Sequence, residues 1–349
     1  MDVSEFDFEL PPDLIAQEPS AERGASRLLY LRRDTGAITH RSIASLPDLL
    51  SAGDLLVVNN TRVFPARLLG RRLPGGGRAE CLLMRRLETG IDHWEALVHP
   101  GQRLGPGARM VFEGSRTLHA EVLSRQFFGR RVVRLWTDDG SAVDEAVDAI
   151  GHVPLPPYIE RPDRPQDRDR YQTVFARERG SVAAPTAGLH LTKSILAALA
   201  ARGVVIVEMT LHVGYATFQP VRAHRVEAHR LDFEHYEISS HAADRLNAAL
   251  AERRRIVAVG TTTTRALEAA ARAGDGRIVA GAGSTDLFIH PGFEFLVIGG
   301  LMTNFHLPRY SLLMLVAAFA GLDQVLGAYR AAIAERYRFY SYGDAMLIL

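Results

Sequence analysis

Three histidines stand at the ends of predicted elements, each in a string that also carries hydroxyl or amide side chains. His190 lies in APTAGLHLT, His212 in TLHVGYATF and His306 in TNFHLPRYS. Histidine titrates near neutral pH and moves protons, so each could serve as a general acid or base. For each, a structural histidine bonded to backbone groups is the alternative. Thr192, which should cap the helix after His190, is compatible with both interpretations.

The string VAVGTTTTRALEAA, residues 257–270, predicts a site for an anion. A strand should end at Gly260, and the threonines that follow lead into a helix. Backbone N–H groups at a helix N-terminus attract phosphate or carboxylate. Thr261 and Thr262 would add hydroxyl groups, with Arg265 one turn further on. A threonine-capped helix without a ligand is the alternative, and no Gly-Lys-Ser/Thr follows to make a Walker A loop.

Several other site classes find no support in the sequence. GAGSTD, residues 281–286, should be followed by a strand, whereas a dinucleotide fingerprint needs a strand before it and a helix after it. The single cysteine, Cys81, cannot form an intrachain disulfide or a cysteine zinc site. The later histidines are not spaced one helical turn apart, and HExxH is absent, so we expect no metal. No G-x-S-x-G string supports a serine hydrolase.

The composition is that of a globular protein with a sizeable core. The chain has 349 residues, of which 47% are hydrophobic, and a formal net charge of +1. The charge balance neither indicates nor excludes a nucleic-acid partner. The acidic N-terminus does not resemble a signal peptide, and the longest apolar run, residues 312–322, is shorter than the ~20 residues that span a bilayer. We therefore expect a cytoplasmic protein without a membrane partner.

The elements that must position these residues follow two patterns. Between about residues 65 and 136, short alternating segments separated by Gly-rich turns predict a small all-β barrel. On both sides, apolar strands alternate with amphipathic helices, which predicts a mostly parallel sheet covered by helices. We expect a discontinuous α/β domain of residues 1–62 and 151–349, with the barrel domain inserted at 63–150. Residues 286–290 and 293–298 are candidate strands.

A proline-rich, charged segment follows the predicted barrel at residues 151–175. Connections of this length are usually functional or disordered. Tyr158, Arg161 and Tyr171 in this segment would suit RNA, because aromatic rings and guanidinium groups stack on bases. A solvated crossover between the two domains is the alternative.

In order along the chain, the strings resemble one family. They include NNTRVFPARL, VPLPPYIERP, APTAGLHLT, VAVGTTTTRALE, TNFHLPRYSLLMLVAAFAG and YSYGDAMLIL. Together these resemble the QueA family of S-adenosylmethionine:tRNA ribosyltransferase-isomerases, which act in queuosine biosynthesis. The resemblance runs from residue 6 to the last residue, and the matching order makes it far more specific than any single string.

The resemblance implies an α/β enzyme with an inserted β-barrel and an uncommon reaction. S-adenosylmethionine would donate its ribosyl group to the aminomethyl nitrogen of 7-aminomethyl-7-deazaguanine at the tRNA wobble position. The product would be epoxyqueuosine, with loss of adenine and methionine. S-adenosylmethionine is then a substrate, tRNA is the partner, and we expect a monomer without a metal.

We carry this chemistry onto the residues as hypotheses. His190 and His306 would share the proton transfers, with His212 as the third candidate. Thr261, Thr262 and Arg265 would hold an anion. The remaining candidates would contact the ribose, a base edge or another part of the substrate: Asn59, Thr186, Asp286 and Asn304. The RNA candidates are Arg62, Tyr158, Arg161 and Tyr171.

Some positions depart from the pattern that we associate with the family. Asn60 stands where aspartate is expected, and Tyr215 with Ala216 replaces a glycine-containing pair. Leu231 and Asp232 interrupt a string that usually reads HKMHSE or HRMHAE, and Ser284 stands at a tryptophan position. These departures keep open a paralogue that uses S-adenosylmethionine on another acceptor. A non-catalytic RNA-binding protein of the same fold is a further alternative, which the histidines at the loop ends argue against.

Overall fold

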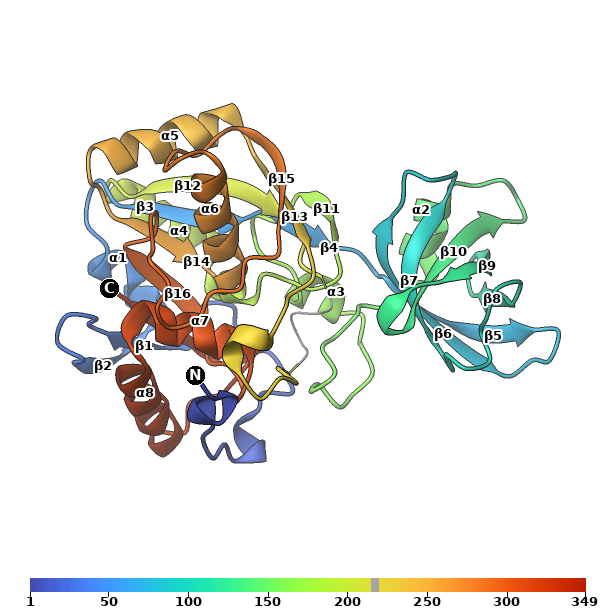
Figure 1. The fold of residues 1–349 in the computed structure, drawn as a ribbon, viewed down its shortest axis with the longest axis horizontal. Coiled ribbons are helices and arrows are strands. Elements are labelled where there is room, and N and C mark those ends of the chain that lie inside the picture. The colour runs from blue at the N-terminus through green and yellow to red at the C-terminus, as the bar shows by residue number, and fades with distance from the viewer. Residues whose placement is uncertain (215–219) are drawn as a thin grey trace.

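In the computed structural model, which describes residues 1–214 and 220–349, the chain forms an α/β domain and a β-barrel (Figure 1). The described residues contribute nine strands to one sheet, in the order β15-β13-β12-β3-β14-β16-β17-β1-β2. The strands are β1 (Arg27–Leu31), β2 (Ile38–Ser42), β3 (Leu55–Asn59), β12 (Val205–Leu211), β13 (Glu234–Ile238), β14 (Ile256–Val259), β15 (Gly281–Thr285), β16 (Gly300–Asn304) and β17 (Ala345–Ile348).

The sheet is mixed, with a parallel centre. Strands β12, β3, β14 and β16 run parallel, and β17 is parallel to β1. Antiparallel pairs join β16 to β17 and complete both edges. The predicted α/β class with an inserted barrel is therefore confirmed, and the antiparallel pairs are the detail that composition did not reveal. Parallel strands place their carboxyl ends at one edge, which is where α/β sheets bind ligands.

Helices cover both faces of this sheet because its strands are apolar on both sides. One face packs against α5 (Ser240–Ala251), α6 (Thr261–Ala273), α7 (Ser311–Ala320) and α8 (Leu322–Ala334). The other packs against α1 (Leu46–Leu49) and α4 (Lys193–Ala201). Leu55 and Val57 face the first layer, whereas Leu56 and Val58 face the second. This alternation is the two-residue period of a strand buried on both faces.

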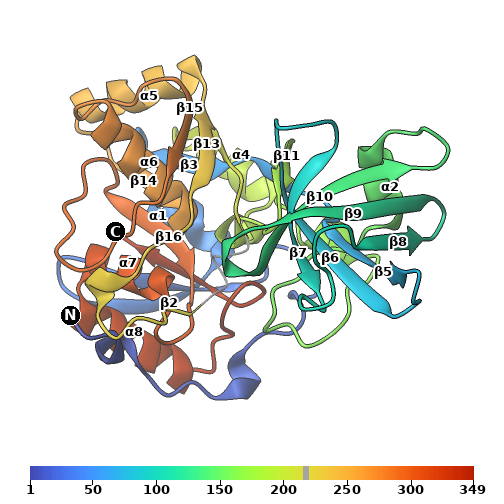
Figure 2. The same ribbon diagram turned by 45° about the vertical axis from the view of Figure 1, so that its right-hand side comes forward.

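A closed six-stranded barrel stands to one side of the α/β domain, as both ribbon views show (Figure 1, Figure 2). Its strands are β5 (Arg67–Leu73), β6 (Arg78–Arg86), β7 (His93–His99), β8 (Arg109–Glu113), β9 (Thr117–Arg125) and β10 (Arg130–Thr137). Helix α2 (Val143–Ile150) packs on the barrel core through Val143, Ala146 and Val147. The exact division at residues 63 and 150 stays a prediction.

The chain leaves the α/β domain after β4 (Thr61–Val63) and returns beside it. Strand β11 (Glu178–Ser181) pairs parallel to β4, so the outgoing and returning segments lie together at the base of the barrel. The returning segment includes the short helix α3 (Asp167–Arg170) and a 3₁₀ turn at Thr186–His190. This pairing holds residues of both segments next to the carboxyl ends of β3 and β12.

Two predicted strands are wrong. Residues 286–290 and 293–298 are not strands, whereas Gly281–Thr285 and Gly300–Asn304 are. Gly281, with φ +126°, begins an edge strand that pairs with β13, so the G-x-G string belongs to the strand itself. The apolar residues of 293–298 are buried instead by the helical layer, in which Val297 and Ile298 pack.

Candidate active site

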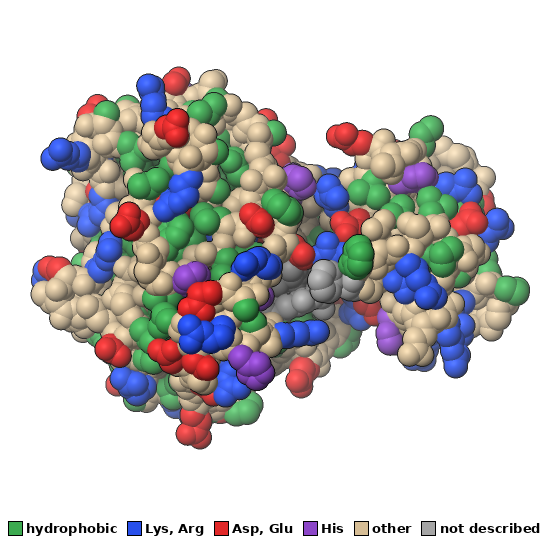
Figure 3. Space-filling model, viewed as in Figure 1, with side chains coloured by type: hydrophobic (Ala, Val, Ile, Leu, Met, Phe, Trp, Pro, Cys, Tyr) green, Lys and Arg blue, Asp and Glu red, His purple; other side chains and the backbone are tan. Residues whose placement is uncertain are grey.

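A cavity of about 360 Å³ lies where the barrel meets the α/β domain. Figure 3 shows the two lobes meeting at a hollow, with side chains of both charges on either side. The wall includes aromatic and charged side chains from both domains: Phe64, Trp94, Arg130, His212, Glu234 and Arg265. Apolar walls with a few convergent polar groups are typical of ligand sites at domain interfaces.

His212 enters this cavity directly after β12. Its Nδ1 lies 2.8 Å from Thr61 Oγ1, and Thr61 donates to Ser181 Oγ at 2.9 Å. With its own proton engaged there, the Thr61 oxygen accepts from His212 Nδ1–H, which leaves the lone pair on Nε2. Burial lowers the pKa of His212, so the ring is neutral at neutral pH. Gly180 allows this ring position, since a Cβ there would lie 2.6 Å from His212 Cε1.

A buried ion pair forms another part of the cavity wall. Arg265 Nη1 lies 2.6 Å from Glu234 Oε2, and both side chains are almost fully buried. Arg265 Nε donates to the Leu287 carbonyl at 2.8 Å. Its Nη2 is buried and has no hydrogen-bond partner within residues 1–214 and 220–349. The guanidinium is therefore fixed in place with donor capacity left for a ligand.

A smaller pocket of about 40 Å³ adjoins the cavity, and the two share Val213 and Leu312. Five of the predicted site residues line it: Thr186, Thr261, Thr262, Asn304 and His306. They come from the 3₁₀ turn, the N-terminus of α6 and the end of β16. Because β14 and β16 are parallel neighbours, the helix start after one lies beside the end of the other.

His190 is bonded to this pocket's wall without lining the pocket. Its Nδ1 lies 2.8 Å from Ser26 Oγ, and its Nε2 accepts from Asn304 Nδ2 at 3.0 Å. The side chain is 4% exposed. Burial, with smaller effects from Arg338 and Arg23, lowers the pKa of His190 to about 4. Both ring nitrogens are thus engaged by protein groups.

His306 lines the small pocket and is also held by the protein. Its Nε2 lies 2.9 Å from Thr303 Oγ1, and its backbone N–H donates to the Tyr329 hydroxyl at 2.9 Å. Burial lowers the pKa of His306 to about 3. At neutral pH the ring is therefore uncharged.

Six predicted substrate or RNA residues lie outside both pockets, beginning with Asn59, Asp286 and Arg62. The side chain of Asn59 joins two strands. Its Nδ2 donates to the Leu211 carbonyl, and its Oδ1 accepts from the backbone N–H groups of Leu211 and Thr61. Its hydrogen-bonding capacity goes to joining β3 and β12. Asp286 and Arg62 are exposed, and neither lines the cavity or the small pocket.

The two predicted stacking tyrosines are packed against protein. Tyr171 is 0% exposed and belongs to a small core cluster beneath the long loop. Its ring therefore presents no face to a base in this structure. Tyr158 is half-buried, its hydroxyl bonds Ser341 Oγ, and its ring lies edge-on to Tyr340 at 3.9 Å between centroids.

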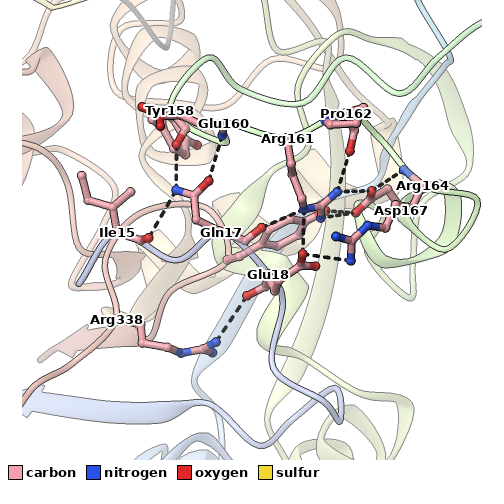
Figure 4. A network of polar contacts seen from close by, with 11 residues as sticks. Ile15, Gln17, Glu18, Tyr158, Glu160, Arg161, Pro162, Arg164, Asp167 and Arg338 are labelled. Atoms are coloured by element: carbon pink, nitrogen blue, oxygen red, sulfur yellow. Dashed lines mark hydrogen bonds and ion pairs between the residues drawn. The ribbon is translucent and has the colours of Figure 1, made fainter. Parts of the chain in front are cut away.

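Arg161 joins the long loop to the N-terminal segment (Figure 4). It bonds Asp167 through Nη1 at 2.7 Å and Nη2 at 3.0 Å, and it pairs with Glu18 at 3.0 Å. Burial would raise the pKa of Asp167, but bonds from Arg161, the Arg164 N–H and Tyr342 outweigh it and hold the pKa below its usual range. The network ties the N-terminal segment to the long loop.

The unusual positions fall in different places. Asn60 accepts from Thr210 Oγ1 at 2.8 Å and donates to Glu208 at 3.3 Å, away from the small pocket. Ser284 is exposed on the edge strand β15. Tyr215 and Ala216 lie outside the described residues.

Leu231 and Asp232 are the unusual pair that does line the large cavity. Asp232 forms an ion pair with Arg130 of β10, and Arg130 also bonds Glu95 at 3.0 Å. Asp232 therefore links the α/β domain to the barrel across the cavity wall.

Sequence reasoning missed Tyr340, Glu234 and Trp94. Tyr340 lines the small pocket and has φ +72°, a backbone angle that no spacing pattern reveals. Glu234 stands in DFEHYEI, where a charged residue reads as an exposed strand position. Trp94 is an inward-facing strand residue at the barrel end, and its alternation marked it only as core.

Among the residues that the structure describes, no cluster of three or more histidine, cysteine, aspartate or glutamate side chains could hold a metal ion. No single described helix is long and apolar enough to cross a bilayer. Helices α7 and α8 reach that length and hydropathy only together, across a bend of 114°.

Comparisons with known proteins agree on one family. The family model described as queuosine biosynthesis protein matches residues 3–348. The S-adenosylmethionine:tRNA ribosyltransferase-isomerase of Anaeromyxobacter sp. is 52% identical, over 100% of this chain and 99% of its own. The same-named protein of Desulfitobacterium hafniense is 50% identical over 100% of both chains.

One solved structure adds a structural match. The crystal structure of an S-adenosylmethionine tRNA ribosyltransferase from Thermotoga maritima is 39% identical to this chain. The match covers 99% of this chain and 100% of the other, with a TM-score of 0.56. A match of family, length and fold at this identity leaves one assignment: the chain belongs to the queuosine biosynthesis protein family.

Proposed function

We propose that this protein is an S-adenosylmethionine:tRNA ribosyltransferase-isomerase that acts on 7-aminomethyl-7-deazaguanine in tRNA. The observation that carries the proposal is the pair of adjoining pockets at the carboxyl edge of the sheet, one large and built from both domains, one small and polar. Full-length relatives at about 50% identity bear this activity in their names. S-adenosylmethionine has an amino-acid end and a nucleoside end, and the acceptor is a base of a tRNA. Two adjoining pockets of different size suit this set of ligands.

The reaction sets clear demands on the site. A base removes a proton from C5′ of the ribosyl group, where the neighbouring sulfonium makes the carbon acidic. The acceptor amine, as the free base, forms a bond to a carbon of the ribosyl unit and gives up one N–H proton to solvent. The unit rearranges, and its C–N bond to adenine and its C–S bond to methionine break, so that both leave. The departing adenine takes up a proton. The site must therefore hold a neutral base, exclude water and bind a dipolar amino-acid end.

His212 is the residue that best meets the first demand. It lies at the large cavity, its neutral ring carries the lone pair on Nε2, and Thr61 fixes that tautomer. We assign it the C5′ proton, which the protonated ring can then give to adenine. A protonated ring with a pKa below 6.5 is a strong enough acid for that transfer.

His190 and His306 have a different role in this proposal. His190 spends both ring nitrogens on Ser26 and Asn304, so it positions Asn304 rather than meeting the substrate. His306 lines the small pocket beside Asn304 as an uncharged group. Arg265, with Nη2 directed to no described protein group, would hold an electron-rich atom of the nucleoside or of the acceptor base.

The barrel supplies the far wall of the site. Trp94 and Phe64 pack against each other with centroids 5.7 Å apart and line the cavity. Both rings are buried in the barrel core, so they give the cavity an apolar wall rather than a free stacking face. The exposed Arg62 on β4, between the two domains, would contact the tRNA backbone.

The test is a direct assay of the wild-type protein. It is mixed with S-adenosylmethionine and tRNA that carries 7-aminomethyl-7-deazaguanine, and adenine release and nucleoside mass are followed. We expect one adenine released for each modified nucleoside that is converted to epoxyqueuosine. With tRNA that carries guanine at that position, we expect neither adenine release nor conversion. Adenine release without epoxyqueuosine would indicate another acceptor. Leu231 and Asp232 would then be the first residues to replace, with the Met and His of the usual HRMHAE string. A folded protein that releases no adenine would remove the proposal.

A further inference from the structure

The small pocket contains two buried polar atoms that the protein leaves unpaired. Asn304 is 2% exposed and Tyr340 is 3% exposed, and both line the pocket. Asn304 Oδ1 and the Tyr340 hydroxyl have no hydrogen-bond partner in the part of the chain that the structure describes. An unsatisfied buried polar atom costs roughly 1–3 kcal/mol, so two together indicate a polar ligand.

The Asn304 amide has one possible orientation. Its Nδ2 donates to His190 Nε2 at 3.0 Å and to the Tyr340 carbonyl at 3.0 Å. Turning the amide over would place its oxygen against the Tyr340 carbonyl and lose that hydrogen bond, whichever tautomer His190 adopts. Ser26, bonded to the far side of His190, holds the imidazole in place. Asn304 therefore offers the pocket an acceptor oxygen, which suits an N–H or ammonium donor.

Tyr340 is held in an unusual backbone conformation to reach the pocket. Its φ of +72° is rare for a bulky residue and costs of order 1–3 kcal/mol. The Tyr340 N–H donates to the Phe305 carbonyl at 3.0 Å, and the ring lies edge-on to Tyr158 and Tyr310. Burial raises the pKa of Tyr340 well above its usual value. The hydroxyl therefore keeps its proton and can donate it in a hydrogen bond.

The N-terminus of α6 adds a site for negative charge. Gly260 begins the helix with φ +97°, and no side chain caps it. The hydroxyls of Thr263 and Thr264 bond the carbonyls of Val259 and Gly260 instead. The first turn, with Thr261 and Thr262 at the pocket, therefore keeps N–H groups for an anion.

These groups form a pattern that one chemical group complements. The acceptor Asn304 Oδ1 suits an ammonium, whereas the Tyr340 hydroxyl and the start of α6 suit a carboxylate. The pocket volume of about 40 Å³ holds roughly three water-sized groups, which is too little for a nucleoside. The α-amino-acid group carries both charges on one carbon and is small enough for a pocket of this size.

We propose that the small pocket binds the α-amino-acid end of S-adenosylmethionine, with Asn304 on the ammonium and Tyr340 and the start of α6 on the carboxylate. The sulfonium would then lie near Val213 and Leu312, which both pockets share, and the ribose and adenine would extend into the large cavity. His212 precedes Val213, so this placement brings C5′ to the proposed base. The inference rests on the proposed function and assigns its substrate's orientation.

The experiment compares two ligands that differ only in the amino-acid end. Binding of S-adenosylhomocysteine and of 5′-methylthioadenosine is measured by calorimetry for wild type, Tyr340→Phe and Asn304→Leu. We expect each variant to lose about tenfold or more in affinity for S-adenosylhomocysteine, because each loses a hydrogen bond to a charged group. Affinity for 5′-methylthioadenosine should stay within about twofold of wild type. Tyr310→Phe, a neighbouring tyrosine that does not line the pocket, is the matched control.

A measurement on wild type alone does not depend on how the variants fold. L-methionine should compete with S-adenosylhomocysteine, whereas 3-(methylthio)propylamine, which lacks the carboxylate, should not. The inference would be overturned if the variants lost as much affinity for 5′-methylthioadenosine as for S-adenosylhomocysteine. It would also be overturned if 3-(methylthio)propylamine competed as well as L-methionine. The adenine-release assay of wild type separates the two proposals. If wild type is active but the variants bind both nucleosides equally weakly, only this inference is wrong. If wild type releases no adenine, both proposals are wrong.

Discussion

Asn304 Nδ2 lies 3.0 Å from His190 Nε2, and this contact changes how both residues are understood. The histidine that looked most like a proton carrier from its loop position serves to orient an amide. The amide in turn presents its oxygen to a pocket that His190 does not line. In the proposed site, some groups would therefore contact the substrate and others would hold those groups in position.

His212→Gln should lower kcat by roughly 10²–10⁴-fold, because it removes the proposed base. KM for S-adenosylmethionine should change little, since the ring contributes no charge at neutral pH. Single-turnover adenine release measures the effect. In wild type, kcat should fall as pH drops below the pKa of His212, which lies under 6.5. His119→Gln, on the barrel surface, is the control; a His212→Gln enzyme with wild-type kcat would refute the assignment.

Thr262→Val should raise KM for S-adenosylmethionine about tenfold, since it removes a hydroxyl from the small pocket. Thr263→Val is its matched control, because the Thr263 hydroxyl bonds the Val259 carbonyl at 2.8 Å. The control should lose about 1 kcal/mol of stability and keep its KM. Steady-state kinetics and urea denaturation distinguish the two. A similar KM increase in both variants would argue against a ligand at the start of α6.

Arg265→Met should destabilise the fold by about 3–5 kcal/mol, because it removes one member of a buried ion pair. Adding Glu234→Gln should restore much of that loss, because the other member is then neutral as well. Urea denaturation measures both variants. The exposed pair of Arg71 and Glu113 is the reference, and Arg71→Met should leave the urea midpoint almost unchanged. A small effect for Arg265→Met would mean that water reaches the pair.

Lowering the pH should destabilise the protein through His190 and His306. Their pKa values of about 4 and about 3 in the folded state lie below the unfolded value of 6.5. As the pH falls through 6.5, His190 and His306 take up protons in the unfolded chain but stay neutral in the native state. Stability is therefore complete above that pH and falls below it, by up to about 1.4 kcal/mol per histidine and pH unit.

Urea midpoints between about pH 7.5 and about pH 5 measure this dependence. His306→Gln should reduce the slope, whereas His224→Gln, at an exposed position, should leave it unchanged. An identical slope in wild type and His306→Gln would contradict the depressed pKa of His306.

Arg62→Gln and Arg161→Gln should separate RNA contact from structure. Arg62 is exposed on β4, so its loss should weaken tRNA binding and reduce the slope of log affinity against log salt by about 1. Arg161 holds the buried Asp167, so its loss should lower the free energy of unfolding by about 3 kcal/mol and leave the salt slope intact. Filter binding over a salt series and urea denaturation decide; an unchanged slope for Arg62→Gln would remove it from the RNA surface.

The local patterns along the chain determined most of the elements. Alternation at residues 78–86 and 93–99 predicted barrel strands, because a strand with one buried face must alternate. The polar strings at element ends marked Thr261, Thr262, Asn304 and His306, since the ends of parallel strands meet at one edge. The order of the strings pointed to the family, which the full-length relatives bear out.

Only the tertiary structure decided which polar group serves which purpose. Asn59 and Asn304 both end buried strands. The side chain of Asn59 is hydrogen-bonded to the neighbouring strand, whereas Asn304 Oδ1 has no hydrogen-bond partner among the described residues. Tyr171 and Tyr340 are both buried tyrosines, but only Tyr340 lines the small pocket. The reason is physical: a hydrogen-bonding group's availability depends on which partners the fold brings within about 3 Å, and sequence separation carries no information about that distance.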